Sequence, residues 1–326
     1  MMRGIRTLPP HQEPAMSRRR TLLTVATLSA AGLAAVMALS GSAAVGAADP
    51  NDAVLIGAGD IAQCKSADPN GNGAALTAAK THELLAANPG ATVFTAGDNA
   101  YPDGSADDFQ KCYEPTWGDF KDRTLPVAGN HEYHTKGAAG HYGYFGAKAG
   151  DPDKGYYSTD LGSWHVIVLN SNCDDVSCKA GGPQEKWLRA DLASHTAKCT
   201  VALWHHPLFT SGLPHGPETA VRPLYQALYD ANADLVITGH NHVYERFAPQ
   251  DPKGKLDESR GLRQFVVGTG GASWYRFGLI KKNSEARSST TWGVIKLTLK
   301  PGSYDWEYAH AGGVQKFEDS GSTNCH

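Results

Sequence analysis

Two pairs of histidines follow short apolar runs that read as buried strands. His205 and His206 end one run, and His240 and His242 follow the other. Imidazole is the commonest metal ligand near neutral pH, and a position just past a buried strand fixes the Cα while the ring can face a cleft. A single histidine there is more often a hydrogen-bonded core residue. Two such strand ends favour a metal site.

Three other apolar runs end in oxygen-bearing side chains: Asp60, Asp98 and Asn130. Carboxylate, amide oxygen and imidazole together suit iron, zinc or manganese better than calcium. These donors are too many for one tetrahedral ion. A carboxylate that bridges two ions is the economical explanation, so the pattern predicts a two-metal hydrolytic site.

The elements that must position these side chains alternate along the first half of the mature chain. We predict strands over 54–59, 91–97 and 124–129, with helices over 74–88 and 106–113. This βαβαβ order indicates a largely parallel sheet covered by helices. Later we predict a hairpin over 155–170, a helix over 183–194, and strands over 263–268, 292–299 and 304–309. No repeat or linker marks a second domain, so residues 49–326 are predicted to form one catalytic domain.

Residues 1–48 are predicted to be an export signal. Arg18, Arg19 and Arg20 precede an uncharged run of 19 residues, 21–39, and small residues follow it. The arginines resemble a twin-arginine signal. An uncleaved membrane anchor is the alternative, since 19 residues can just span a bilayer. The Ala, Ser and Thr content favours cleavage, which predicts a secreted protein without stable membrane association.

Charge and cysteine content narrow the class of protein. Removal of residues 1–48 takes away five of the 30 basic and one of the 33 acidic residues and leaves a net charge of −7. No basic run remains, which argues against a nucleic-acid partner. The absence of any Cys-x-x-Cys pair argues against a structural zinc protein. Six cysteines in an exported chain favour disulfides. Among the 15 connectivities that six cysteines allow, we predict Cys173–Cys178, Cys64–Cys112 and Cys199–Cys325.

Five fragments in order resemble the motif set of the calcineurin-like metallophosphoesterases. They are Gly-Asp60, Gly-Asp98-Asn-Ala-Tyr101, Gly-Asn130-His131-Glu132, His205-His-Pro207 and Gly-His240-Asn-His242. Each fragment alone is weak, but all five in order are specific. The resemblance implies an α/β fold of the metallophosphoesterase type, a four-layer α/β/β/α sandwich with two mixed sheets.

The first metal position resembles that of the purple acid phosphatases. One family variant has Asp-x-His there, but this chain has Ala62, where purple acid phosphatases usually have glycine. Their ligand is instead a tyrosine three residues after the bridging aspartate, where this chain has Tyr101. Trivalent iron lowers the phenol pKa, and tyrosinate then helps to hold Fe(III). The resemblance assigns to a ferric ion Asp60, Asp98, Tyr101 and His242, and to a divalent ion (Fe, Zn or Mn) Asp98, Asn130, His205 and His240.

The resemblance also implies roles around the metals. Asn130 and His131 would contact the substrate phosphate. His206 would lie next to the substrate site, behind the metal ligands. His215 resembles a histidine that protonates the leaving group, the alternative being a solvated loop histidine. The implied function is a secreted phosphatase that hydrolyses small phosphomonoesters by attack of a metal-bound hydroxide. The alternatives are a phosphodiesterase with the same site and a non-catalytic phosphate- or metal-binding protein.

Overall fold

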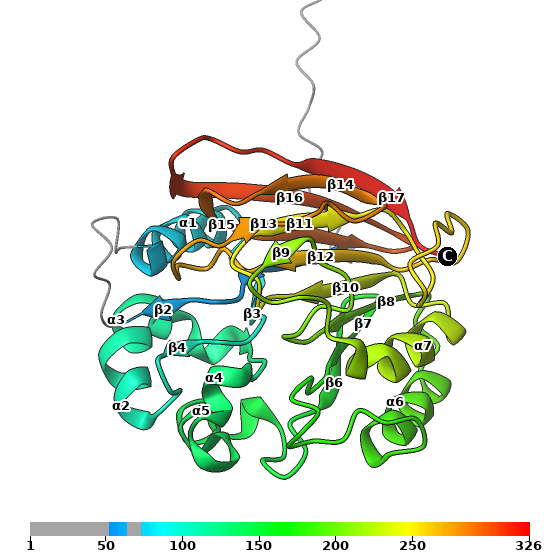
Figure 1. Cartoon of the computed structure of the whole chain (residues 1–326), viewed down its shortest axis with the longest axis horizontal. Helices are drawn as coiled ribbons and strands as arrows, with labels where there is room; N and C mark the ends of the chain where they lie inside the picture. The colour runs from blue at the N-terminus through cyan, green and yellow to red at the C-terminus, as the bar shows by residue number, and fades with distance from the viewer. Residues whose placement is uncertain (1–51, 64–72) are drawn as a thin grey trace, which may run out of the picture. The chain divides into compact units, whose positions relative to one another are not determined.

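Two mixed sheets form the centre of the computed structural model, which describes residues 52–63 and 73–326 (Figure 1). In the described residues the first sheet has six strands, in the order β17-β16-β15-β1-β3-β5. β1, β3 and β5 are parallel, and β15 is antiparallel to β1. The bounds are β1 Ala53–Ala58, β3 Thr92–Thr95, β5 Thr124–Leu125, β15 Thr291–Lys300, β16 Ser303–Gly313 and β17 Ser320–Asn324.

The second sheet has seven strands among the described residues, in the order β14-β11-β12-β10-β8-β7-β6. β7, β8, β10 and β12 are parallel, with β6 and β11 antiparallel to their neighbours. The bounds are β6 Tyr157–Leu161, β7 Trp164–Val168, β8 Cys199–Leu203, β10 Leu235–Thr238, β11 Tyr244–Phe247, β12 Arg263–Val267 and β14 Ser284–Ser288. Two short pairs complete the strands: β2 (Ala62–Gln63) with β4 (Ala100–Tyr101), and β9 (Gly212–Leu213) with β13 (Arg276–Phe277).

Helices cover the outer faces of the sheets. Helix α1 (Gly73–Ala87) contacts β15 and β16, while α6 (Pro183–Ser194) and α7 (Arg222–Asp230) lie side by side next to the second sheet (Figure 1). Shorter helices lie between β4 and β6: α2 (Ala106–Asp108), α3 (Glu114–Trp117), α4 (Asn130–Tyr133) and α5 (Ala139–Phe145). α2 and α3 are joined by a π-helical turn over Phe109–Tyr113, so the helix predicted for 106–113 is present but irregular.

The alternation of side chains along the central strands explains the layered packing. Val166 and Val168 of β7 belong to the apolar core that both sheets share, whereas Ile167 belongs to a second core that includes Leu188 of α6. Successive side chains of a strand point to opposite faces, and both faces are apolar here. The strand is therefore buried on both sides, as expected for parallel sheets covered by helices.

Most predicted elements are present, with differences at polar strands. The helix predicted for 183–194, the 155–170 hairpin and the final strand pair are all found. The third strand ends at Leu125 rather than residue 129, because Pro126 has no N–H for a ladder and Val127 N donates to Thr95 Oγ1 instead. β11, β14 and β17 were not predicted; β14 and β17 lie at sheet edges and lack an apolar face.

Two of the three predicted disulfides lie within the described residues, and both are found, Cys173–Cys178 and Cys199–Cys325. The predicted Cys64–Cys112 pair involves Cys64, which lies outside those residues, as does the predicted export signal. In the part of the chain that is described, no helix is long and apolar enough to cross a bilayer.

Candidate metal centre

The loops after five central strands meet where the two sheets adjoin. Asp60 follows β1, Asp98 follows β3, Asn130 begins α4 just after β5, and the histidines follow β8 and β10. Backbone hydrogen bonds align these loops: Asp60 N donates to Gly97 O at 3.0 Å, and Gly239 N donates to His205 O at 3.0 Å. Gly59 N also donates to Val267 O of β12, which joins the two sheets at the site. The strand-end side chains of both sheets therefore converge.

Backbone conformation at the site is strained in the way that functional sites often are. Asp60, Asp98 and His240 have φ values of 60°, 50° and 68°, which non-glycine residues rarely adopt. Two glycines allow the close approach of the loops. A Cβ on Gly129 would lie 2.2 Å from Asp98 Oδ1, and one on Gly97 would lie 2.4 Å from His205 Nδ1. Glycine is thus a steric requirement at these two positions, directly before Asp98 and Asn130.

One group of donor atoms surrounds the phenol of Tyr101. Its oxygen lies 3.2 Å from Asp60 Oδ1, 3.2 Å from Asp98 Oδ2 and 3.0 Å from His242 Nε2. His242 Nδ1 donates to the carbonyl of Ser273, so Nε2 can offer a lone pair. A single phenol proton cannot satisfy both carboxylates and the imidazole. Their arrangement suits a cation.

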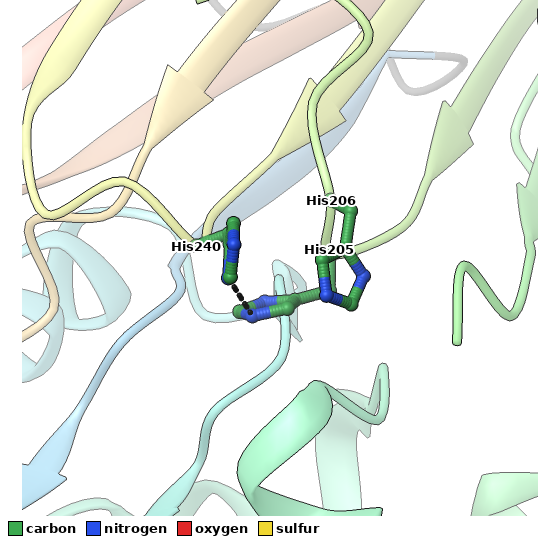
Figure 2. Close-up of side chains that lie close together, drawn as sticks. All are labelled: His205, His206 and His240. Carbon is green, nitrogen blue, oxygen red and sulfur yellow. Dashed lines mark hydrogen bonds between the residues drawn. The ribbon is translucent and has the colours of Figure 1, made fainter. Parts of the chain in front are cut away.

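A second group surrounds His205 Nε2. This atom lies 3.1 Å from Asn130 Oδ1 and 3.3 Å from Asp98 Oδ2. It also lies 3.2 Å from His240 Nδ1, the contact that Figure 2 shows as a dashed line. The other nitrogen, Nδ1, donates to the carbonyl of Ala96 at 2.8 Å, which fixes the ring. Asp98 Oδ2 thus adjoins both groups, as an atom that bridges two ions would.

The charges of the buried residues show that this position favours a cation. Burial opposes ionisation of Asp98, but the positive charge of His205 outweighs it and holds the pKa of Asp98 well below its usual range. Burial opposes protonation of His205, yet the charge of Asp98 raises the pKa of His205 to about 9. Burial raises the pKa of Tyr101 far above its usual value, and the two carboxylates raise it further. A metal ion would supply the positive charge and favour the tyrosinate. The residues present fit such an ion.

The three remaining predicted residues surround these groups. His131 Nε2 lies 3.8 Å from Asp98 Oδ2, and its Nδ1 contacts the carbonyl of Pro102. The rings of His206 and His215 lie 4.4 and 4.2 Å from the ring of His240. All ten predicted site residues therefore lie together, although His206 turns its Nδ1 toward Ser171 Oγ at 2.9 Å.

Glu132 is a buried positioning residue to which the sequence argument gave no role. Its carboxylate accepts hydrogen bonds from the backbone N–H groups of Gly129 at 2.7 Å, Asn99 at 2.8 Å and Asp98 at 3.0 Å. Burial and the charge of Asp98 raise the pKa of Glu132 to about 7, against those hydrogen bonds. It ties the loop after β3 to the loop after β5. Its position directly after Asn130 and His131 is the feature of the sequence that could have indicated a role at the site.

Ser171 and Tyr275 also contribute without having been predicted. Ser171 Oγ accepts from the backbone of His205 at 3.2 Å and of His206 at 2.9 Å, which holds that turn in place. The ring of Tyr275 stacks on His242, with centroids 3.9 Å apart and planes within 6°. Ser171 could have been noticed because it follows a predicted strand end. An aromatic residue in a loop carries no such signal.

Comparison with known proteins agrees with the motif order. The calcineurin-like phosphoesterase family matches residues 55–244, more than half of the 326 residues. Purple acid phosphatase 18 of Arabidopsis thaliana is 32% identical over 146 residues, covering 43% of this chain and 31% of that protein. An uncharacterized protein of Mycobacterium tuberculosis is 29% identical over 206 residues, covering 48% of this chain and 39% of that protein. The chain thus spans about two fifths or less of these relatives.

Solved structures agree on the fold. The purple acid phosphatase PPD1 of yellow lupin aligns with a TM-score of 0.66 at 20% identity, covering 84% of this chain and 54% of that one. A dimetal phosphatase of Danio rerio aligns with a TM-score of 0.55 at 14% identity, covering 82% and 98%. The expected α/β fold with mixed sheets is confirmed. From the family match and the ordered motifs together, we conclude that this chain belongs to the calcineurin-like phosphoesterases.

Proposed function

We propose that this protein is a dinuclear metal-dependent phosphatase that hydrolyses phosphomonoesters. The observation that carries the proposal is the position of Asp98 Oδ2, 3.2 Å from the Tyr101 oxygen and 3.3 Å from His205 Nε2. Asp60, Tyr101 and His242 would hold a ferric ion on one side of this atom. Asn130, His205 and His240 would hold a divalent ion (Fe, Zn or Mn) on the other side. Two such ions polarise phosphoryl oxygens and lower the pKa of water.

The protein's own residues would orient the ester and move protons. His131 donates from Nδ1 to the carbonyl of Pro102, so its protonated ring could donate from Nε2 to the phosphate. Asn130 precedes His131 at the start of α4, and its Oδ1 lies 3.1 Å from His205 Nε2. His215 lies beside His240 and Tyr275 and is half-buried, which suits a group that protonates the departing alcohol.

Loss of the His131 side chain tests this contact. We expect His131→Ala to lower kcat/KM on an aryl phosphate by about a hundredfold, the usual effect of a positioned proton donor. Metal content should remain at about two ions per chain, because His131 is not in either donor group. The matched control is His82→Ala, an exposed histidine that pairs with Asp119. A loss of metal in His131→Ala would contradict the proposed role.

Replacing Tyr101 tests the ferric side. Tyr101→Phe should abolish the violet tyrosinate–ferric absorption of the metal-loaded protein, since phenylalanine cannot ligate iron. Tyr275→Phe is the control because Tyr275 also contacts His242 but lies outside the donor group. The visible spectrum of each variant is the measurement. A band that survives in Tyr101→Phe and disappears in Tyr275→Phe would transfer the ligand role to Tyr275.

The function itself is tested by metal analysis together with two substrates. We expect about two metal ions per chain and faster hydrolysis of an aryl phosphate than of a bis-aryl phosphate. The reverse preference would make the protein a phosphodiesterase with the same site. Hydrolysis that continues after complete removal of the metals would refute the proposal.

We further propose that the protein is exported. The support is the arginine-led apolar segment in residues 1–48 and the two disulfides within the described residues, because disulfides persist in oxidising compartments. Detection of a processed N-terminus in the culture medium tests this. Recovery of only the full-length chain from the cytoplasm would contradict it.

A further inference from the structure

Glu245 of β11 is a fully buried carboxylate that belongs to neither donor group of the candidate metal centre. It accepts hydrogen bonds from Ser211 N at 2.7 Å, Ser211 Oγ at 2.6 Å and Ser284 Oγ at 2.6 Å. The next residue, Arg246, pairs with Glu285 instead. A buried carboxylate is costly unless hydrogen bonds satisfy it, so these donors permit Glu245 in the interior. Two of the three bonds come from one residue, Ser211.

Ser211 begins the segment 211–218, here called the His215 loop. Its carbonyl oxygen accepts from Gly278 N at 2.8 Å, and its hydroxyl oxygen accepts from Lys281 N at 2.9 Å. The next two residues form β9, which pairs with β13. Because Glu245 binds the N–H and the hydroxyl of Ser211, every polar group of this residue is hydrogen-bonded. The upstream end of the loop is therefore fixed, and Glu245 holds two of its bonds.

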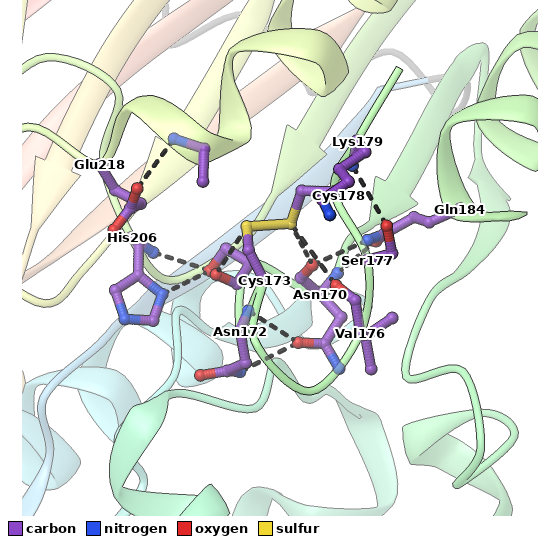
Figure 3. The surroundings of a disulfide bond; sticks show 12 residues. Asn170, Asn172, Cys173, Val176, Ser177, Cys178, Lys179, Gln184, His206 and Glu218 are labelled. Atoms are coloured by element: carbon purple, nitrogen blue, oxygen red, sulfur yellow. Dashed lines mark hydrogen bonds between the residues drawn. A yellow bond between two sulfur atoms is a disulfide. The ribbon is translucent and has the colours of Figure 1, made fainter. Parts of the chain in front are cut away.

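The downstream end of the His215 loop has a separate anchor. Glu218 N donates to Pro207 O at 2.8 Å. The Glu218 carboxylate accepts from Ala220 N at 2.8 Å, a contact that Figure 3 shows as a dashed line. Neither bond involves Glu245. Loss of the Glu245 carboxylate would therefore loosen one end of the loop and leave the other end attached.

The ring of His215 has no hydrogen-bonded anchor of its own. Within the described residues it contacts the rings of His240 and Tyr275, at centroid distances of 4.2 and 5.5 Å, and makes no hydrogen bond. Ring contacts are satisfied over a wide range of distances, whereas a proton donor must lie within about 2.6–3.2 Å of the atom that it protonates. The position of this imidazole therefore depends on the backbone of the His215 loop, and so on Ser211 and Glu245.

On the basis of the proposed phosphomonoesterase activity, we propose that Glu245 is a positioning residue, which through Ser211 holds His215 where its ring can protonate the departing alcohol. When the P–O bond to the alcohol breaks, the alcohol oxygen keeps the electron pair and takes the proton of the imidazolium, and the ring regains a proton from water. An alkoxide is a strong base and needs that proton to leave. Dinitrophenolate is a weak base and leaves without it. Loss of Glu245 should therefore slow the hydrolysis of alkyl esters selectively.

The test compares ethyl phosphate with dinitrophenyl phosphate on the metal-loaded full chain. We expect Glu245→Ala to lower kcat on ethyl phosphate by about thirtyfold and kcat on dinitrophenyl phosphate by only about twofold, because a positioned general acid contributes roughly a hundredfold or more. Glu245→Gln should keep the ratio of the two rates within about threefold, since its amide oxygen can accept from Ser211 N and its amide nitrogen can donate to the serine hydroxyls. Equal losses on both esters in Glu245→Ala would show a merely structural role and overturn the proposal.

A double variant shows whether Glu245 acts through His215. His215→Ala should lower the ethyl-to-dinitrophenyl ratio by about a hundredfold, and His215→Ala, Glu245→Ala should lower it no further, because changes that act through one group are not additive. A further fall in the double variant, or an unchanged ratio in His215→Ala, would overturn the proposal. If Glu245→Ala does not fold, Ser211→Ala removes only the hydroxyl bonds and should lower the ratio by about threefold. An unchanged ratio in Ser211→Ala would then overturn it.

The matched control is Asp234→Ala. It removes another buried carboxylate that accepts from backbone N–H groups, those of Thr200 and His326, away from the His215 loop. The ratio of the two rates should equal that of the unmodified protein. A fall as large as that in Glu245→Ala would assign the effect to a general loosening of the fold and overturn the proposal. Failure of the proposed function is distinct, because then the unmodified protein would hydrolyse neither ester.

Discussion

Asp98→Asn is expected to lower kcat on an aryl phosphate by about a thousandfold or more, which corresponds to about 4 kcal/mol of transition-state stabilisation. Bound metal should fall from about two ions per chain to at most one. The physical reason is that Asp98 Oδ2 adjoins both donor groups, at 3.2 Å from the Tyr101 oxygen and 3.3 Å from His205 Nε2. An amide has the same shape but lacks the negative charge that would bridge two cations.

The control for this variant is Asp234→Asn. Asp234 is also buried, and it accepts from Thr200 N and His326 N at 2.8 and 2.9 Å, outside either donor group. It therefore reports the cost of placing an amide at a buried carboxylate position without touching the metals. Metal analysis and the rate are measured on both variants, with thermal unfolding as a check of the fold. Two ions retained in Asp98→Asn would contradict the bridging role.

The grouping of the site residues could be predicted because several of them follow buried strands that are rich in apolar residues. Asp60, Asp98 and His240 come directly after such runs, and a glycine stands just before each. Buried parallel strands are nearly continuous apolar runs, so their ends are visible in sequence. Parallel strands also bring their carboxyl ends to one edge, where ligands bind in open α/β sheets. The assignment of individual residues to the two metal ions came from the resemblance of the ordered motifs to a known family, and not from geometry.

Other features could not be predicted because they depend on tertiary contacts. Glu132 accepts hydrogen bonds from Asp98 and Asn99, 34 and 33 residues away in sequence. β17 pairs with β16 through its backbone, and its sequence Ser-Gly-Ser-Thr-Asn has no apolar side chain to reveal it. Tyr275 reaches His242 from a loop after β12. The sequence identifies each side chain, but the atoms that it contacts depend on how the two sheets pack together.

The disulfide Cys199–Cys325 joins the two sheets, and its removal should have the largest effect on stability. Cys199 begins β8 in the second sheet, and Cys325 follows β17 at the edge of the first. The two cysteines are 126 residues apart, so the bond restricts a large loop in the unfolded chain. We expect Cys199→Ala, Cys325→Ala to lower the free energy of unfolding by about 5 kcal/mol on the chain-entropy scale.

Cys173→Ala, Cys178→Ala is the matched comparison, because that bond closes a sequence separation of only 5. The same chain-entropy scale predicts that this double variant lowers the free energy of unfolding by about 2 kcal/mol. Both variants are measured by urea unfolding under oxidising conditions, with the slope checked so that the free energies can be compared. Because the two sheets meet at the metal centre, Cys199→Ala, Cys325→Ala should also weaken the packing of the sheets there. This variant should therefore lose its metal at a lower urea concentration than Cys173→Ala, Cys178→Ala. Equal losses in both would contradict the loop-length argument and would place the stabilisation in the packing of the sulfur atoms.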